Sequence, residues 1–149
     1  MPGRMLRVNI REATASDAAA LAELSTQLGY PMPPGEAAQR LQVLEGRPGN
    51  AVLVAEEDGR VLGWLHVCGM FFLESPPFAE VAGLVVDQAS RGRGTGKLLL
   101  AAAARWAAEQ GFGNLRVRSN VIRESAHRFY EREGFRRVKS QVVLDLELP

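Results

Sequence analysis

The sequence predicts a mixed α+β fold in a single domain spanning residues 1–149. Segments with alternating apolar residues are interspersed with segments whose apolar residues recur at helical spacing, and glycine- or proline-rich turns separate them. A chain of 149 residues is long enough to bury one hydrophobic core. In the second half of the chain a strand, a helix and another strand follow one another, and this order predicts a crossover between two parallel strands.

The first half of the chain begins with alternation over residues 6–11, which predicts a strand. Capping residues at 14–17 precede a helical pattern that ends at Leu28, where Gly29 follows as a stop signal. Three prolines place residues 30–34 in a loop. A second helix is expected from about residue 35 to residue 45.

Two strands over residues 51–57 and 61–72 should form a hairpin, because Asp58-Gly59 between them is a strong two-residue turn signal. Residues 74–77 should close that unit before a strand over 79–86. The remaining elements expected are a helix over 97–110, a strand over 115–118, a helix over 123–133 and two strands within 135–148.

Composition excludes several classes of protein. The net charge of +1 provides no general attraction for nucleic acid or an anionic membrane. The single cysteine, Cys68, rules out an internal disulfide, and with only two isolated histidines we expect no metal site. The chain shows no signal peptide and no apolar stretch approaching the roughly 18 residues of a membrane span. A cytoplasmic protein is therefore expected.

A glycine-rich run directly after the strand over 79–86 predicts a phosphate site. Glycines at 92, 94 and 96 let the backbone approach a ligand, and the following helix presents unpaired N–H groups to an anion. The cations are Arg91, Arg93 and Lys97. The alternative interpretation is a solvated basic turn.

Two common nucleotide motifs fit this run poorly. A P-loop requires glycine at 91 and Ser or Thr at 98, where the chain has Arg91 and Leu98. A dinucleotide fingerprint requires glycine at 97, where the chain has Lys97.

A third motif fits closely. Arg91, Gly94 and Gly96 resemble the acetyl-CoA motif of the GNAT superfamily of N-acetyltransferases, which is Gln or Arg, two residues, Gly, one residue, then Gly or Ala. Residues 126–135 (AHRFYEREGF) resemble the family's A-x-x-x-Y-x-x-x-G-F segment, and the similarity covers about residues 79–138. The resemblance implies a central, mostly antiparallel sheet of seven strands flanked by about four helices. It also implies a V-shaped splay, in which the strands ending at Val86 and Arg118 diverge from each other.

The resemblance further implies how acetyl-CoA is bound. The amides of residues 92–97 (Gly92, Arg93, Gly94, Thr95, Gly96 and Lys97) would hold the pyrophosphate, after Arg91. The strand edge at Leu84, Val85 and Val86 would pair with the pantetheine arm. Many relatives have asparagine where this chain has Arg123, so Asn120 or Arg123 would take over that contact, near Ala126 and His127.

For the chemistry, Tyr130 is the candidate general acid, because tyrosine has a pKa near 10 and keeps its proton at neutral pH. Its alternative role is to pack its ring in the core. Glu80 is the candidate base or amine anchor, on a strand otherwise made of apolar residues. Its alternative is a solvated strand-end glutamate. The amide near Leu84 is the oxyanion donor that the resemblance implies.

We therefore expect direct acetyl transfer from acetyl-CoA to a primary amine of a small molecule or peptide. The rival hypotheses are a non-catalytic CoA-binding sensor on the same fold and a nucleoside-triphosphate enzyme. Glutamates at 36, 45, 74 and 80 hint at a cationic acceptor. Many relatives form homodimers through the C-terminal strands, so the resemblance also suggests a homodimer.

Overall fold

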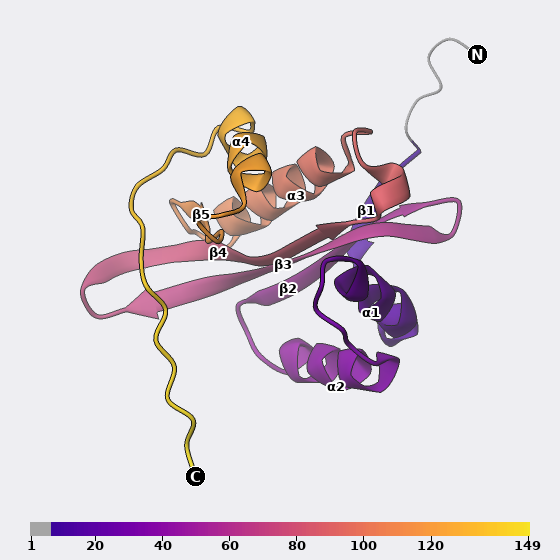
Figure 1. Ribbon diagram of the computed structural model, residues 1–149, viewed down its shortest axis with the longest axis horizontal. Helices are drawn as coiled ribbons and strands as arrows, with labels where there is room; N and C mark the ends of the chain where they lie inside the picture. Colours follow the sequence, from indigo (N-terminus) through magenta and orange to yellow (C-terminus); the bar gives the residue numbers. More distant parts are fainter. Residues whose placement is uncertain (1–6) are drawn as a thin grey trace. The chain divides into compact units, whose positions relative to one another are not determined.

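The computed structural model describes residues 7–149, in the order of elements drawn in Figure 1. Its helices are α1 (Ala18–Gln27), α2 (Pro34–Glu45), α3 (Thr95–Glu109) and α4 (Glu124–Arg132), with short 3-10 turns η1 (Ala15–Asp17) and η2 (Gln88–Ser90). Its strands are β1 (Asn9–Glu12), β2 (Asn50–Glu57), β3 (Arg60–Phe72), β4 (Ser75–Val86) and β5 (Leu115–Val117). The chain forms two compact units, Met1–Val117 and Arg118–Pro149, and each is described by itself. The single-domain organisation stays a prediction. Within residues 7–149, no helix has the length and apolar character to cross a membrane.

The first unit is built on a five-stranded sheet in the order β1-β2-β3-β4-β5. The first four strands are antiparallel neighbours, and β4 pairs with β5 in parallel, which confirms the predicted crossover through α3. Asp58 and Gly59 join β2 to β3 with φ angles of 51° and 79°. Positive φ at both central residues is what a type I′ turn requires, so the predicted hairpin is also confirmed.

Helices cover both faces of this sheet. Neighbouring residues of a strand point to opposite faces. Trp64 of β3 packs against a cluster that includes Leu21 of α1 and Leu41 of α2. Gly63, the preceding residue, faces α3, since a Cβ added there would lie 3.3 Å from Leu99 Cδ1. The pair α1 and α2 therefore lies on one face and α3 on the other, as Figure 1 shows.

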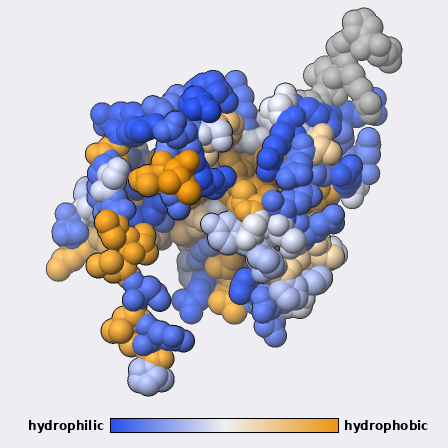
Figure 2. All heavy atoms as spheres, viewed as in Figure 1, coloured by the Kyte–Doolittle hydropathy of each residue, from blue (hydrophilic) through white to orange (hydrophobic). Residues whose placement is uncertain are grey.

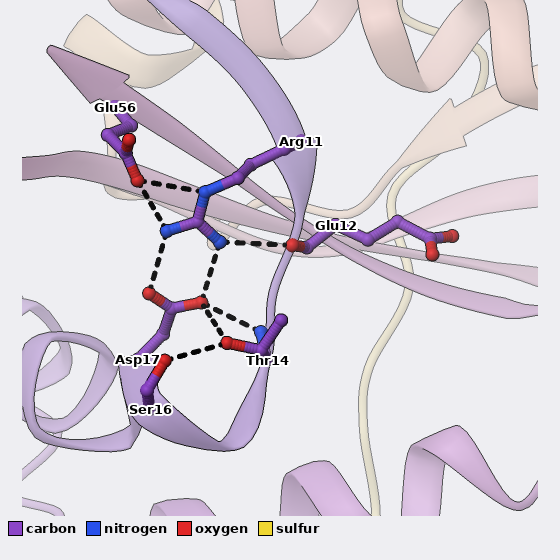
Figure 3. Close-up of polar contacts among 6 residues, drawn as sticks. All are labelled: Arg11, Glu12, Thr14, Ser16, Asp17 and Glu56. Atoms are coloured by element: carbon purple, nitrogen blue, oxygen red, sulfur yellow. Dashed lines mark hydrogen bonds and ion pairs between the residues drawn. The ribbon is translucent and has the colours of Figure 1, made fainter. Parts of the chain in front are cut away.

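A network centred on Arg11 joins β1, β2 and the entry to α1 (Figure 3). The Arg11 guanidinium donates two hydrogen bonds to Asp17, of 2.8 and 2.9 Å, and its Nε donates to Glu56 at 2.8 Å. Asp17 is buried and also accepts the Thr14 N–H at 2.7 Å. The bond from Arg11 lowers the pKa of Asp17, so the carboxylate stays charged although burial opposes this.

Most element boundaries lie within two residues of those predicted, whereas β1 and β4 differ by more and α2 begins inside an expected loop. β1 runs over Asn9–Glu12 rather than over residues 6–11, and Leu6 lies outside the described residues. α2 begins at Pro34, within the expected loop, because a proline in the first helical turn lacks only an N–H that the helix does not use. β4 begins at Ser75, so Pro76 and Pro77 lie inside the strand. This stretch of β4 precedes its pairing with β5 and contains a register shift, two places where a strand tolerates proline.

The two strands expected within residues 135–148 are not formed, so the described sheet has five strands and not seven. The alternating Val and Leu residues indicate strand propensity, but a strand also needs a neighbouring strand to accept and donate its backbone hydrogen bonds. Val142, Val143, Leu144 and Leu146 are instead 81–88% exposed. Figure 2 shows hydrophobic and hydrophilic residues side by side along this C-terminal segment. A homodimer formed through it stays a prediction.

Candidate active site

The glycine-rich run forms the connection between β4 and α3. η2 follows β4 directly, and residues 91–94 then form a turn that leads into α3. Gly92 and Gly94 have φ angles of 82° and 83°, and Gly94 is the N-cap of the helix. A residue with a side chain would be strained in this left-handed conformation. The two glycines therefore permit a conformation that other residues rarely adopt.

The N-terminus of α3 opens onto this turn. The first intrahelical hydrogen bond runs from the Leu98 N–H to the Gly94 carbonyl at 3.1 Å. The N–H groups of Thr95, Gly96 and Lys97 therefore lack carbonyl partners in the helix and carry its positive dipole end. This is the arrangement in which helices bind phosphate groups.

The three predicted cations of the loop behave differently. Arg91 and Lys97 are exposed, and neither forms an ion pair within residues 7–149. Arg93 instead donates two hydrogen bonds of 3.0 Å to the Glu57 carboxylate at the end of β2. Two of the three cations therefore remain available to an anionic ligand, and the third holds the loop in place.

Asp87 is a residue of this region that sequence reasoning missed. It is buried at the end of β4, and its carboxylate accepts the Ala89 N–H at 3.2 Å, which caps η2. That hydrogen bond, followed by those of Gln27 and Arg60, lowers the pKa of Asp87. An Asp that precedes a turn is a recognised capping signal, but its partner Gln27 is 60 residues away and could not be identified from the sequence.

β4 contains a bulge beside the loop. His66 on β3 faces Gly83, whereas the next residue, Val67, faces Val81, so Ala82 is an extra residue in β4. The parallel pairing with β5 also ends at Val81. From Ala82 onward, this edge of β4 has no strand partner among the residues described. The splay between the strands ending at Val86 and Arg118 stays a prediction.

The backbone groups on that edge can be assigned from the ladder. The Asp87 N–H donates to the Leu62 carbonyl at 2.8 Å, so these two residues form a hydrogen-bonded pair. Hydrogen-bonded and non-hydrogen-bonded pairs alternate along antiparallel strands. The polar backbone groups of Val85 therefore face β3, and those of Leu84 and Val86 point to the unpaired edge. Of the three residues predicted to pair with pantetheine, Leu84 and Val86 have the required orientation.

Glu80 precedes the bulge in β4, and its partners in the sheet are Cys68 of β3 and Arg116 of β5. The residue is 8% exposed, so it is not the solvated strand-end glutamate of the alternative interpretation. Burial, together with the charge of Glu80, raises the pKa of the Cys68 thiol. Cys68 therefore stays protonated at neutral pH and is a poor nucleophile.

The second unit contains Tyr130 on α4. Its ring makes edge contacts with Phe129 and Phe135, with ring centroids 5.2 and 5.6 Å away. The Phe135 N–H also donates to the Tyr130 carbonyl at 3.0 Å, which ties the end of the helix to this residue. Burial raises the pKa of Tyr130, and the nearby charge of Arg123 opposes that shift. The phenol therefore keeps its proton at neutral pH and can donate it.

The turn before α4 is organised around Asn120. Its side-chain oxygen accepts the Ile122 N–H at 3.1 Å, and its carbonyl accepts the Arg123 N–H at 3.0 Å and the His127 Nε2–H at 2.9 Å. Arg123 is the N-cap residue of the helix, and Ala126 is half-buried in its first turn. The Asn120 side chain thus holds the turn through its oxygen, and its NH2 group can donate to a ligand.

Comparison with known proteins gives consistent results. The model of the Acetyltransferase (GNAT) family matches residues 18–135. The aminoglycoside N(6')-acetyltransferase type 1 of Stenotrophomonas maltophilia is 30% identical over 143 residues, which cover 93% of each chain. The solved structure of aminoglycoside N-acetyltransferase AAC(6')-Iy in complex with CoA is similar with a TM-score of 0.87, at 19% identity over 99% of each chain. A transcriptional regulator from Bacillus halodurans C-125 is similar with a TM-score of 0.85, at 23% identity over 94% of this chain and 100% of that one.

Proposed function

The chain belongs to the GNAT acetyltransferase family, and from that premise we propose that it transfers an acetyl group from acetyl-CoA directly to a primary amine of a small molecule. Membership makes it an acetyl-CoA-dependent N-acetyltransferase. The observation that carries the proposal is the loop of residues 91–97, in which two left-handed glycines lead into the open N-terminus of a long helix. Acetyl-CoA, when bound, supplies the activated acetyl group as a thioester.

The residues at the loop fit a CoA pyrophosphate. The N–H groups of residues 95–97 can donate to phosphate oxygens, and Arg91 and Lys97 add positive charge at the same turn. No side chain at Gly92 or Gly94 obstructs the approach of a ligand. The backbone groups of Leu84 and Val86 can pair with the amides of a pantetheine arm, as an added strand would.

Three groups of the chain would carry the reaction. The Leu84 N–H, which points away from β3, would stabilise the oxyanion that develops on the acetyl carbonyl. Tyr130 would donate its proton to the departing thiolate, for which a raised pKa keeps the proton in place. Glu80 would accept a proton from the amine or hold the amine in position. We propose no covalent enzyme intermediate, since burial raises the pKa of the Cys68 thiol and makes it a poor nucleophile.

For the acceptor we propose a small cationic amine of the aminoglycoside or polyamine type. The Stenotrophomonas maltophilia relative is named for acetylation of an aminoglycoside amine. The buried carboxylate of Glu80 is consistent with a cationic acceptor. Because directly opposite residues share a face, Glu80 lies with Cys68 and Trp64 on the face that α1 and α2 cover.

Two measurements test the proposal. Calorimetric titration should show one CoA bound for each chain, with no binding of ATP and magnesium. Release of free thiol from acetyl-CoA should then depend on an amine, in a panel of an aminoglycoside, a polyamine, an amino sugar and a peptide. Tight CoA binding without turnover on any amine would favour the sensor hypothesis, whereas binding of ATP in place of CoA would refute the assignment of the loop.

Replacing Tyr130 by Phe separates binding from catalysis. If Tyr130 is the general acid, Tyr130→Phe should lower kcat by about 10²–10⁴-fold, the usual contribution of acid–base catalysis, with the affinity for CoA unchanged. Phe129→Leu is a suitable control, because it changes the aromatic packing around Tyr130 and keeps the hydroxyl. An unchanged kcat in Tyr130→Phe would exclude Tyr130 as the proton donor.

A further inference from the structure

Two side chains at the β2–β3 turn reach the pyrophosphate loop from opposite ends of that turn. Glu57 and Arg60 are direct partners across the Asp58-Gly59 turn. They carry opposite charges, but within residues 7–149 they do not form an ion pair with each other. Glu57 instead binds Arg93 through both carboxylate oxygens at 3.0 Å, and Arg60 binds Asp87 at 2.6 Å.

A third contact comes from the last residue of α1. The Gln27 side chain accepts the Gln88 N–H at 3.1 Å and donates to the Asp87 carboxylate at 3.4 Å. One amide group therefore holds both the backbone and the side chain of the segment that enters the loop. Asp87, just before η2, and Arg93, within the loop, are therefore both held by side chains from other elements, and Arg91 and Gly92 lie between them in the chain.

We propose that Gln27, Glu57 and Arg60 are positioning residues, here called the anchor residues, that hold the pyrophosphate loop in its binding conformation before the ligand arrives. The inference rests on the proposed function, since it takes the loop to be the CoA site. None of the anchor residues needs to touch the ligand. Their effect passes through Asp87 and Arg93.

The physical reason is the flexibility of the loop itself. Glycine populates many backbone conformations, and Gly92 and Gly94 must both adopt positive φ for the amides to converge. Ordering flexible residues costs conformational entropy, and an unanchored loop would have to lose that entropy at the moment of binding. Contacts already made in the ligand-free protein remove that loss from the binding step.

The charges also favour this arrangement over direct contact. Arg93 bound to Glu57 is neutralised and adds little attraction for a phosphate. Its value lies in fixing the chain immediately before Gly94, the N-cap of α3. Arg60 neutralises Asp87, whose buried carboxylate would otherwise stand close to an anionic ligand at the end of β4.

The test is the dissociation constant of CoA measured by calorimetry on the full chain at 15 °C. The double variant Glu57→Gln and Arg60→Gln should raise the dissociation constant about ten-fold, an effect typical of lost preorganisation. Arg60→Lys, which keeps a cation near Asp87, should restore most of the affinity lost in Arg60→Gln. Arg40→Gln removes an exposed ion pair with Glu36 on α2 and is the matched control, with unchanged affinity.

The outcomes separate three explanations. If the parent protein does not bind CoA, the proposed function fails and the anchor role falls with it. If the parent binds CoA and the double variant binds within two-fold of it, the anchor role alone is refuted. A general loss of structure would lower the ligand-free unfolding temperature and would not be rescued by the conservative Arg60→Lys change. The positioning role predicts the reverse: weaker binding by a protein that remains folded, with rescue by lysine.

Discussion

Thr95, the first residue of α3, contains a hydroxyl group whose removal should stabilise the protein. The residue is 1% exposed, and its Oγ1 has no hydrogen-bond partner within residues 7–149. Burying an unpaired hydroxyl costs about 1–3 kcal/mol in proteins. Valine has nearly the same shape and replaces this hydroxyl by a methyl group. We therefore expect Thr95→Val to raise the free energy of unfolding by about 1–2 kcal/mol.

The assay is thermal unfolding without ligand, in which the midpoint should rise by about 2–8 °C for a chain of this length. Thr95→Ser is the control, because it keeps the unpaired hydroxyl and removes the methyl group, so it should lower the midpoint. The affinity for CoA should stay within two-fold in Thr95→Val, since backbone amides are expected to bind the pyrophosphate. A destabilised valine variant would show that the hydroxyl has a partner. A ten-fold loss of CoA affinity would show that it contacts the ligand.

Three further predictions concern other parts of the first unit. Gly94→Ala should cost about 1–2 kcal/mol of stability in a thermal scan, because an alanine side chain has room there but is strained at a φ of 83°. Gly94→Asn should cost less, and equal costs for the two variants would argue against the left-handed conformation. Gly83→Ala should cost about 1–3 kcal/mol in urea unfolding, because its Cβ would lie 2.9 Å from the Trp64 ring, and the cost should shrink in a Trp64→Leu background. Arg11→Met should cost about 2 kcal/mol, because it leaves the buried Asp17 carboxylate without its guanidinium. The pKa of Asp17 in the folded state lies below its unfolded value near 3.9. The stability that charged Asp17 gives the fold is therefore complete above about pH 3.9 and is lost as the pH falls through the lower folded value. The parent protein should lose stability in acid more steeply than Arg11→Met, and parallel acid curves of the two proteins would contradict the assignment.

The sequence was most informative where a local pattern determines the backbone. The Asp58-Gly59 hairpin, the crossover through α3 and the glycine turn all depend on residues close together in the chain, and the structure contains each of them. The pattern failed at residues 135–148, where strand propensity had no pairing partner to act on. It also failed at Pro76 and Pro77, where the position within the sheet, which is not local information, allows proline in a strand.

The candidate site shows the same division. The loop residues and Tyr130 were singled out by their motifs, whereas the anchor residues that hold the loop were not. Arg93 was expected to face a phosphate, but it binds Glu57, a residue 36 positions earlier. Such pairs depend on which strands become neighbours, so spacing along the chain does not reveal them. The bulge at Ala82 likewise arises from the register between β3 and β4, which no feature of the apolar run of β4 indicates.

The central claim is that the loop of residues 91–97 binds the donor acetyl-CoA. The most direct test is a titration of the ¹⁵N-labelled protein with CoA, followed by the backbone amide signals in an NMR spectrum, for which a mass of 16.2 kDa is convenient. We predict the largest shifts at residues 92–97 and at Leu84 and Val86, whose amides face the open edge of β4. Loop amides that stay unmoved while CoA binds elsewhere, or that respond equally to ATP with magnesium, would contradict the claim.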